Sequence, residues 1–309
     1  MIWGIVFSYL EGRKYTEILG VILCTSFIVS SGVVKSIGLW VMASWGVTQF
    51  WMPAVTGALF IIPLVFFARL LETVPQPTQE EKALRVERVP MRPKDRSNVI
   101  KQFALPLFIL ILFYIVLTAF RDLRDNYARE LWDGLGYAGD ISVYSTSELV
   151  VAFLVLIILA SVYAIKDNLK ALLTYHGILL FGTFSVGIAT FLLQAQLLNP
   201  FLWMVISGFG LYICYVPFNA LFFDRFIAAF RIKGNAGFLI YLADAFGYLG
   251  SMAVLLYKNF GMSTISWLKF FINGAYWLSV IGSVSVVVSF FYLRKKHRKA
   301  NFNIMAYEN

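Results

Sequence analysis

Several ionisable residues interrupt long apolar stretches of the sequence, where a charge costs about 2.5–3.5 kcal/mol on insertion into a membrane. Asp244 is the clearest, because it lies well inside the apolar stretch 236–257. Helical spacing of i−3 and i+4 would put the phenols of Tyr241 and Tyr248 on the same face as this carboxylate. We interpret Asp244 as a group that couples protons or binds a cation, with a hydrogen-bonded strut between helices as the alternative.

A second group of charges closes the apolar stretch 103–120, and it consists of Arg121, Asp122, Arg124 and Asp125. Arg121 and Asp125 are four residues apart and can pair on a helix. If this helix end faces a central cavity, the two arginines could hold a carboxylate or a phosphate group bidentately. The alternative is a charge network that caps the helix at the membrane surface.

Three further polar residues are candidates for the same site. Glu148 opens an apolar stretch, where it could balance Arg124, accept a proton or simply favour the first turn of a helix. Lys35 lies late in another stretch, and it either extends to the membrane surface or meets an anionic solute. Asn219 follows aromatic residues at helical spacing, and together they could line a cavity or pack on neighbouring helices and lipid.

Other patterns do not predict a cofactor. The G-x-G-x-x-G pattern at 134–139 follows a predicted helix instead of a strand, so it does not predict a nucleotide site. The two cysteines, Cys24 and Cys214, and the two histidines, His176 and His297, are too few for a disulfide framework or a metal site. We therefore expect no enzymatic activity, no cofactor and no resident metal.

The apolar stretches that must position these residues dominate the composition. The chain has 309 residues, of which 60% are apolar and 14% charged, against roughly 25% charged in soluble proteins. The mean hydropathy is +0.75. So little polar surface cannot cover a soluble domain of this size, and intrinsic disorder is excluded for the same reason. We expect an integral membrane protein whose main partner is the lipid bilayer.

Runs of about 20 apolar residues are long enough to cross a bilayer as helices. We predict an all-helical fold with eight full transmembrane helices and a partial helix, Met1–Leu10. The predicted spans are 17–40, 48–70, 103–120, 147–165, 171–193, 200–223, 236–257 and 270–293.

The basic residues indicate an orientation. Twenty of the 26 lysines and arginines fall in alternate connections and in the C-terminal tail, and the other six fall on the opposite side. Because cytoplasmic loops are enriched in lysine and arginine, this asymmetry places the C-terminus in the cytoplasm. The net charge of +9 is accounted for in this way, and we expect no nucleic-acid partner.

One long hydrophilic connection, rich in proline and charge, divides the chain. We predict the remnant of an N-terminal half in residues 1–70, a cytoplasmic loop in 71–102, a six-helix half in 103–293 and a basic tail in 294–309.

Six helices after a long basic loop, with a part before it that echoes the second, resemble the major facilitator superfamily. Four runs, VFSYLEGRKYTE (6–17), FWMPAVTG (50–57), LTAFRDLRDN (117–126) and the run 223–251 ending in LADAFGYLGS, resemble a bacterial branch of it of unknown function. The resemblance implies an inner-membrane protein that holds helices four to twelve of a twelve-helix transporter and lacks the first three.

The resemblance also implies roles. In that superfamily, charged pairs at cytoplasmic helix ends latch one conformation, which implies a gating role for Glu11, Arg13, Asp224 and Arg225. The alternative is that these residues only anchor the helix ends at the membrane interface. It implies secondary active transport by alternating access of a small organic solute, with an anionic solute as one option and protons or sodium as coupling ions. The alternatives are a transport-inactive sensor or scaffold derived from a transporter, or a non-functional fragment.

Overall fold

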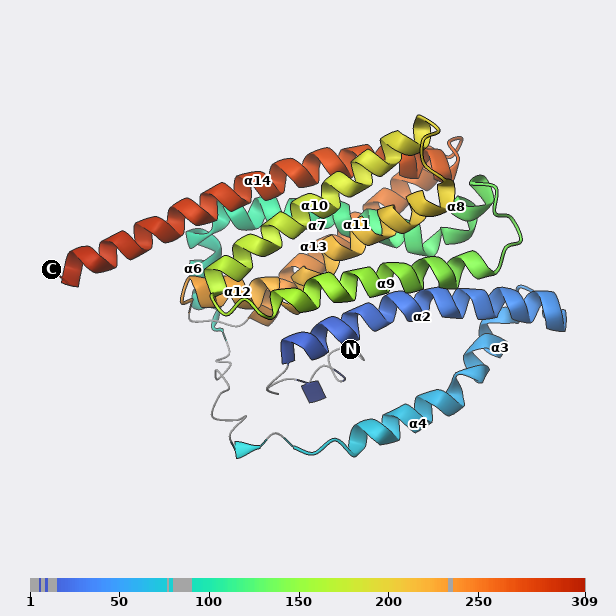
Figure 1. Cartoon of the computed structure of the whole chain (residues 1–309), viewed down its shortest axis with the longest axis horizontal. Helices are drawn as coiled ribbons and strands as arrows, with labels where there is room; N and C mark the ends of the chain where they lie inside the picture. The colour runs from blue at the N-terminus through green and yellow to red at the C-terminus, as the bar shows by residue number, and fades with distance from the viewer. Residues whose placement is uncertain are drawn as a thin grey trace.

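The structure is a computed structural model of the chain. It describes residue 6 and the ranges 9–10, 16–76, 78–79, 91–232 and 236–308. The major elements in these residues are all helices (Figure 1). The prediction of a helical fold is confirmed for this part of the chain.

Seven helices within the described residues are long and apolar enough to cross a membrane, as expected of an integral membrane protein. A bent helix pair raises this number to eight if it counts as one span. The seven are α2 (Thr16–Trp45), α7 (Ala104–Asn126), α9 (Ser142–Val162), α10 (Asn168–Gln194), α11 (Pro200–Ala220), α13 (Ala236–Leu256) with the π-helical turn η1 (Tyr257–Gly261), and α14 (Trp267–Glu308).

The bent pair corrects one predicted span. Residues 48–70 do not form one straight helix, because α3 (Met52–Leu59) and α4 (Ile61–Glu72) meet at an angle of 41°. Pro63 lies in the first turn of α4, where it lacks an amide hydrogen and its ring would clash with the carbonyl of Leu59 in a continuous helix. The proline therefore explains the break.

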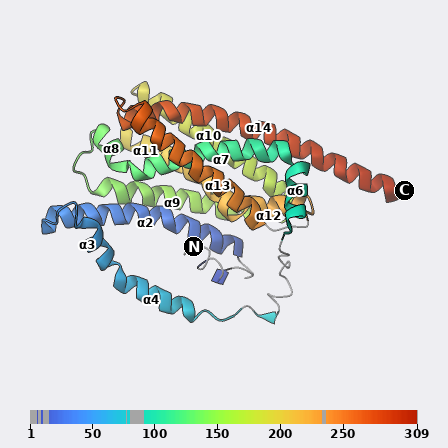
Figure 2. The same cartoon turned by 180° about the vertical axis from the view of Figure 1, so that it is seen from behind.

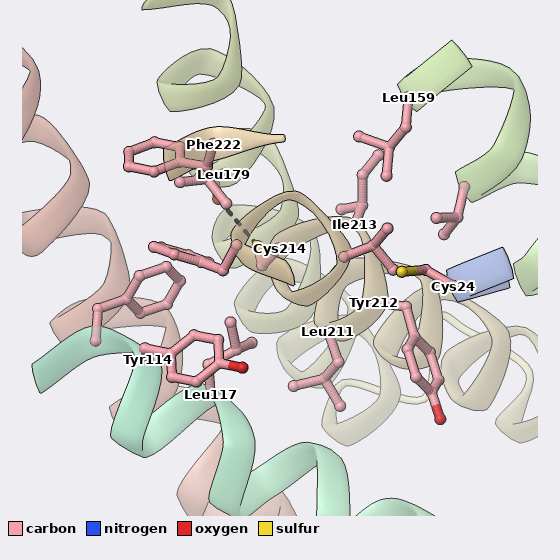
Figure 3. Packing of buried hydrophobic residues seen from close by; sticks show 14 of the residues in the cluster. Cys24, Tyr114, Leu117, Leu159, Leu179, Leu211, Tyr212, Ile213, Cys214 and Phe222 are labelled. Carbon is pink, nitrogen blue, oxygen red and sulfur yellow. Dashed lines mark hydrogen bonds between the residues drawn. The ribbon is translucent and has the colours of Figure 1, made fainter. Parts of the chain in front are cut away.

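Helix α11 is the most deeply buried of the spans, and it forms the centre of the bundle. Figure 3 shows Leu211, Tyr212 and Ile213 pointing from it towards different neighbours, while the Cys214 thiol is within 3.3 Å of the Leu179 carbonyl of α10. The predicted span 200–223 ends early, because α11 stops at Ala220 and the short helix α12 (Phe222–Ala229) follows.

Four other spans contact α11. Helices α7, α9 and α10 pack directly on it, α2 packs chiefly on α9, and α14 packs on α10 and α7 (Figures 1 and 2). Helix α13 packs on α7 and leaves most of its surface uncovered.

Three features were not predicted from hydropathy. Two short helices, α6 (Pro93–Gln102) and α8 (Ala128–Gly134), flank α7. Helix α14 has 42 residues, or about 63 Å at 1.5 Å per residue, which is twice the thickness of a hydrocarbon core. Its C-terminal part projects beyond the bundle (Figure 1).

Candidate functional site

A buried ion pair lies where four helices meet. Nη1 of Arg124, near the end of α7, donates to Oε1 of Glu148 on α9 at 2.7 Å, and Nη2 donates to the Met204 carbonyl of α11 at 3.1 Å. The two side chains are only 2% and 10% exposed. Arg124 Nε and Glu148 Oε2 are buried without a hydrogen-bond partner, so each charge keeps unused bonding capacity. Of the roles that the sequence left open for Glu148, the structure shows the ion pair with Arg124.

Two glycines make room for this pair. A Cβ atom on Gly208 of α11 would lie 2.6 Å from Cζ of Arg124, so the guanidinium rests directly against the helix backbone. A Cβ atom on Gly32 of α2 would lie 2.8 Å from Cβ of Glu148 and 2.5 Å from the Tyr144 carbonyl. No side chain fits at either position without a shift, and α2, α7, α9 and α11 are held around the charges.

A second ion pair joins α2 to α7. The ammonium of Lys35 contacts the carboxylate of Asp125, which also accepts a hydrogen bond of 2.6 Å from the Ser31 hydroxyl. Lys35 lies 2.9 Å from the same hydroxyl, which closes a three-residue ring of polar contacts. Lys35 therefore faces the bundle instead of extending to the membrane surface.

Arg121 does not pair with Asp125 as its spacing suggested. Its Nη2 contacts the neighbouring Asp122 carboxylate, and its guanidinium lies over the ring of Tyr215 on α11, 3.8 Å from the centroid. Asp125 pairs instead with Lys35. This contact was not predicted because the two residues are far apart in the sequence. Arg121 Nε is buried without a hydrogen-bond partner.

Asp244 lies in the seam between α13 and α7. Its Oδ1 accepts a hydrogen bond of 2.5 Å from the Tyr114 phenol, which in turn accepts one of 2.9 Å from the Asn219 amide of α11. Tyr241 and Tyr248 were expected on the face of Asp244, but they are 70% and 60% exposed, on the uncovered side of α13. The phenol that binds the carboxylate belongs to another helix.

A third ion pair joins the first turn of α2 to α12. Arg225 donates to Oε2 of Glu17 at 2.7 Å and to the Asn168 side-chain oxygen of α10 at 2.8 Å. Asp224 neighbours it in the same short helix. The other two predicted gating residues, Glu11 and Arg13, lie outside the described residues.

The sequence model of DUF5690, a family of unknown function, matches residues 1–296. The chain belongs to this family. No curated protein and no solved structure matches the chain.

The charged residues of this DUF5690 chain thus gather around α7 and α2, but sequence reasoning missed several of their partners. Sequence reasoning did not single out Glu17, Tyr114 or Ser31. The signal that could have found them is a polar side chain facing the side of a helix that carries small residues. Within the part of the chain that the structure describes, no three His, Cys, Asp or Glu side chains gather to hold a metal ion.

Proposed function

We propose that this chain is a secondary active transporter that moves a small organic solute by alternating access, coupled to protons or sodium. Its major facilitator character, with the first three helices outside this sequence, is part of the proposal. The support comes from how the membrane-embedded charges are arranged, since such charges are costly and are therefore typical of functional sites.

The observation that carries the proposal is that two ion pairs connect α2 to the rest of the bundle, one in its first turn and one two-thirds of the way along it. Glu17 binds Arg225 of α12, and Lys35 binds Asp125 of α7. The two residues of α2 are 18 positions apart, or about 27 Å along a helix, which is close to the thickness of the hydrocarbon core. Alternating access needs two such closures, one on each side, that open in turn.

The groups that would meet the solute lie close to the Lys35–Asp125 ion pair, within about one turn of Asp125 on α7. Arg124 and Arg121 each keep a buried Nε without a hydrogen-bond partner, which suits a carboxylate or phosphate group of the solute. Asp244 is half-buried beside them, and Arg121 interacts with it electrostatically. A carboxylate in this position is our candidate for ion coupling.

The first experiment finds a solute and measures its uptake. The full chain is screened against metabolites by thermal shift, since a ligand that binds only the folded protein raises its melting temperature. The ligands that stabilise it are then offered to proteoliposomes with and without a pH or sodium gradient. We expect uptake above equilibrium that collapses when the gradient is dissipated.

The variants Glu17→Gln and Arg225→Gln test the role of the ion pair between α2 and α12, which we call the Glu17 tie. Either should reduce uptake by about tenfold with little change in binding, and the charge swap Glu17→Arg with Arg225→Glu should restore part of the rate. Glu130→Gln, a change of the same type at an exposed position, is the matched control. Binding without uptake in the wild-type protein would replace the carrier with the sensor or scaffold alternative.

A further inference from the structure

A separate cavity opens at the end of the bundle that is remote from Glu17 and Arg225. It has a volume of about 410 Å³, within the usual range of about 300–1,000 Å³ for small-molecule sites. Its walls are the last turns of α2, the short helix α8 and the loop that leads to α9. The glycine pattern 134–139 forms this loop, and Gly136 and Gly139 adopt φ angles of 90° and 83° that other residues rarely take. The glycines thus shape the wall of a cavity.

The cavity contains both signs of charge. Arg129 and Asp133 line it from α8, with Nε and Oδ2 3.8 Å apart, which is too long for a hydrogen bond. Both side chains are about half exposed, so each is available to a ligand. Asp140 lines it from the loop, and its carboxylate accepts bonds of 2.9 and 2.7 Å from the Ser142 amide and hydroxyl. These bonds hold the pKa of Asp140 below its ordinary value, so it is ionised at neutral pH.

The remaining wall is apolar apart from Tyr144 of α9. Leu39, Met42 and Ala43 face the cavity from α2, and Ile141 faces it from the loop. A ligand that fills the space would therefore present an aliphatic group to α2 and its charged groups to the α8 side.

We propose that this cavity binds a zwitterionic amino acid with an aliphatic side chain. The α-carboxylate pairs with the guanidinium of Arg129, the α-ammonium pairs with Asp140, and the side chain packs on Leu39 and Met42 of α2. Each charge of the ligand meets an opposite charge of the cavity, which fixes its orientation. The proposal concerns binding alone and does not depend on transport by the chain.

The other ligand classes fit less well. An anion without an ammonium group would face two carboxylates, and an amine without a carboxylate would leave Arg129 with only its long contact to Asp133. A resident metal ion would need a third ligand, and among the described residues no group of three metal-binding side chains exists.

Isothermal titration of the full chain in nanodiscs tests the assignment with L-leucine and two analogues that each lack one charge. Isoamylamine lacks the carboxylate, and isocaproate lacks the ammonium. We expect L-leucine to bind at least about tenfold more tightly than either analogue, because each lost ion pair removes charge-assisted hydrogen bonds.

Two variants assign the charges. Arg129→Gln should remove the preference for L-leucine over isoamylamine, and Asp140→Asn should remove the preference over isocaproate. Glu130→Gln, next to Arg129 on α8, and Lys269→Gln, exposed at the start of α14, are controls that should bind as the wild type does. No binding of L-leucine, equal binding of an analogue, or binding unchanged by both variants would overturn the proposal and leave the carrier proposal untouched.

Discussion

The guanidinium of Arg124 and the carboxylate of Glu148 form a salt bridge of 2.7 Å that is enclosed between the glycine backbones of two further helices, at Gly208 and Gly32. An enclosed salt bridge adds little to the free energy of unfolding, because the cost of removing two charges from water is about as large as their attraction. It does fix which helix faces meet. The pair therefore defines the junction of α2, α7, α9 and α11 and keeps charge available inside the bundle.

Breaking this pair from one side should destabilise the protein strongly. Arg124→Met or Glu148→Met alone leaves an uncompensated buried charge, which costs about 3–5 kcal/mol. The double variant Arg124→Met with Glu148→Met should recover most of that loss, because no charge remains buried. Thermal unfolding in detergent measures all three.

The exposed pair of Arg129 and Asp133 provides the control, since its side chains are 59% and 43% exposed. Arg129→Met should change stability by no more than about 1 kcal/mol. Single variants of the buried pair that melt at the wild-type temperature would contradict the enclosure that we describe.

The close approach at Gly208 gives a second prediction. Gly208→Ala should lower the melting temperature, because the added methyl group enters the space of the Arg124 guanidinium. Gly177→Ala in α10 is the matched control, since nothing lies within 4 Å of its added Cβ atom. The alanine there should be neutral or stabilising.

A double-mutant cycle shows that Arg124 is the cause. Gly208→Ala should cost clearly less in a background that already carries Arg124→Ala, because the clashing group is gone. Equal costs in both backgrounds would mean that the alanine disturbs another contact of α11.

The sequence suggested contacts between opposite charges that lie at a similar depth in the membrane, such as Glu148 with Arg124. It could not predict that Asp125 pairs with Lys35 instead of Arg121. Helical spacing identifies neighbours on the same helix and gives no information about contacts with another helix. Arg225 and Glu17 are separated by 208 positions in the chain, and only the packing of α2 against the bundle brings them together.

The fold, like the site, could be predicted only in part from the sequence. Hydropathy located the long spans, since it reports burial in lipid over about 20 residues. It did not detect the break near Pro63, because the residues on both sides are equally apolar. The break results from the missing amide hydrogen of proline, which an average of hydropathy does not detect.

The two native cysteines report on the seam between α2 and the bundle. Cys24 lies on α2, which packs on α9 and α11, whereas Cys214 of α11 lies within the bundle near the Leu179 carbonyl (Figure 3). Both are buried, so both should react slowly with N-ethylmaleimide, which attacks accessible thiolates. Weakening the tie at Glu17 should raise the reaction rate of Cys24 without changing that of Cys214.

Mass spectrometry of the labelled protein follows both thiols in the same sample. Glu17→Gln is compared with wild type and with Glu130→Gln, which leaves the tie intact. A faster reaction of both cysteines would indicate general loosening of the fold. An unchanged reaction rate of both would contradict the inference that the Glu17–Arg225 ion pair holds α2 against the bundle.

The last prediction separates the two interpretations of Asp244. Asp244→Asn should abolish proton-dependent uptake and leave expression intact, because the amide oxygen can still accept the hydrogen bond of Tyr114 but cannot exchange a proton. Tyr114→Phe keeps the carboxylate and removes the hydrogen bond, so its uptake should still depend on pH. If Asp244 were only a strut between α13 and α7, the outcome would reverse: Tyr114→Phe would lower the melting temperature, and Asp244→Asn would transport across pH as the wild type does. Uptake at several pH values, measured together with melting temperatures for both variants, distinguishes a proton carrier from a packing contact.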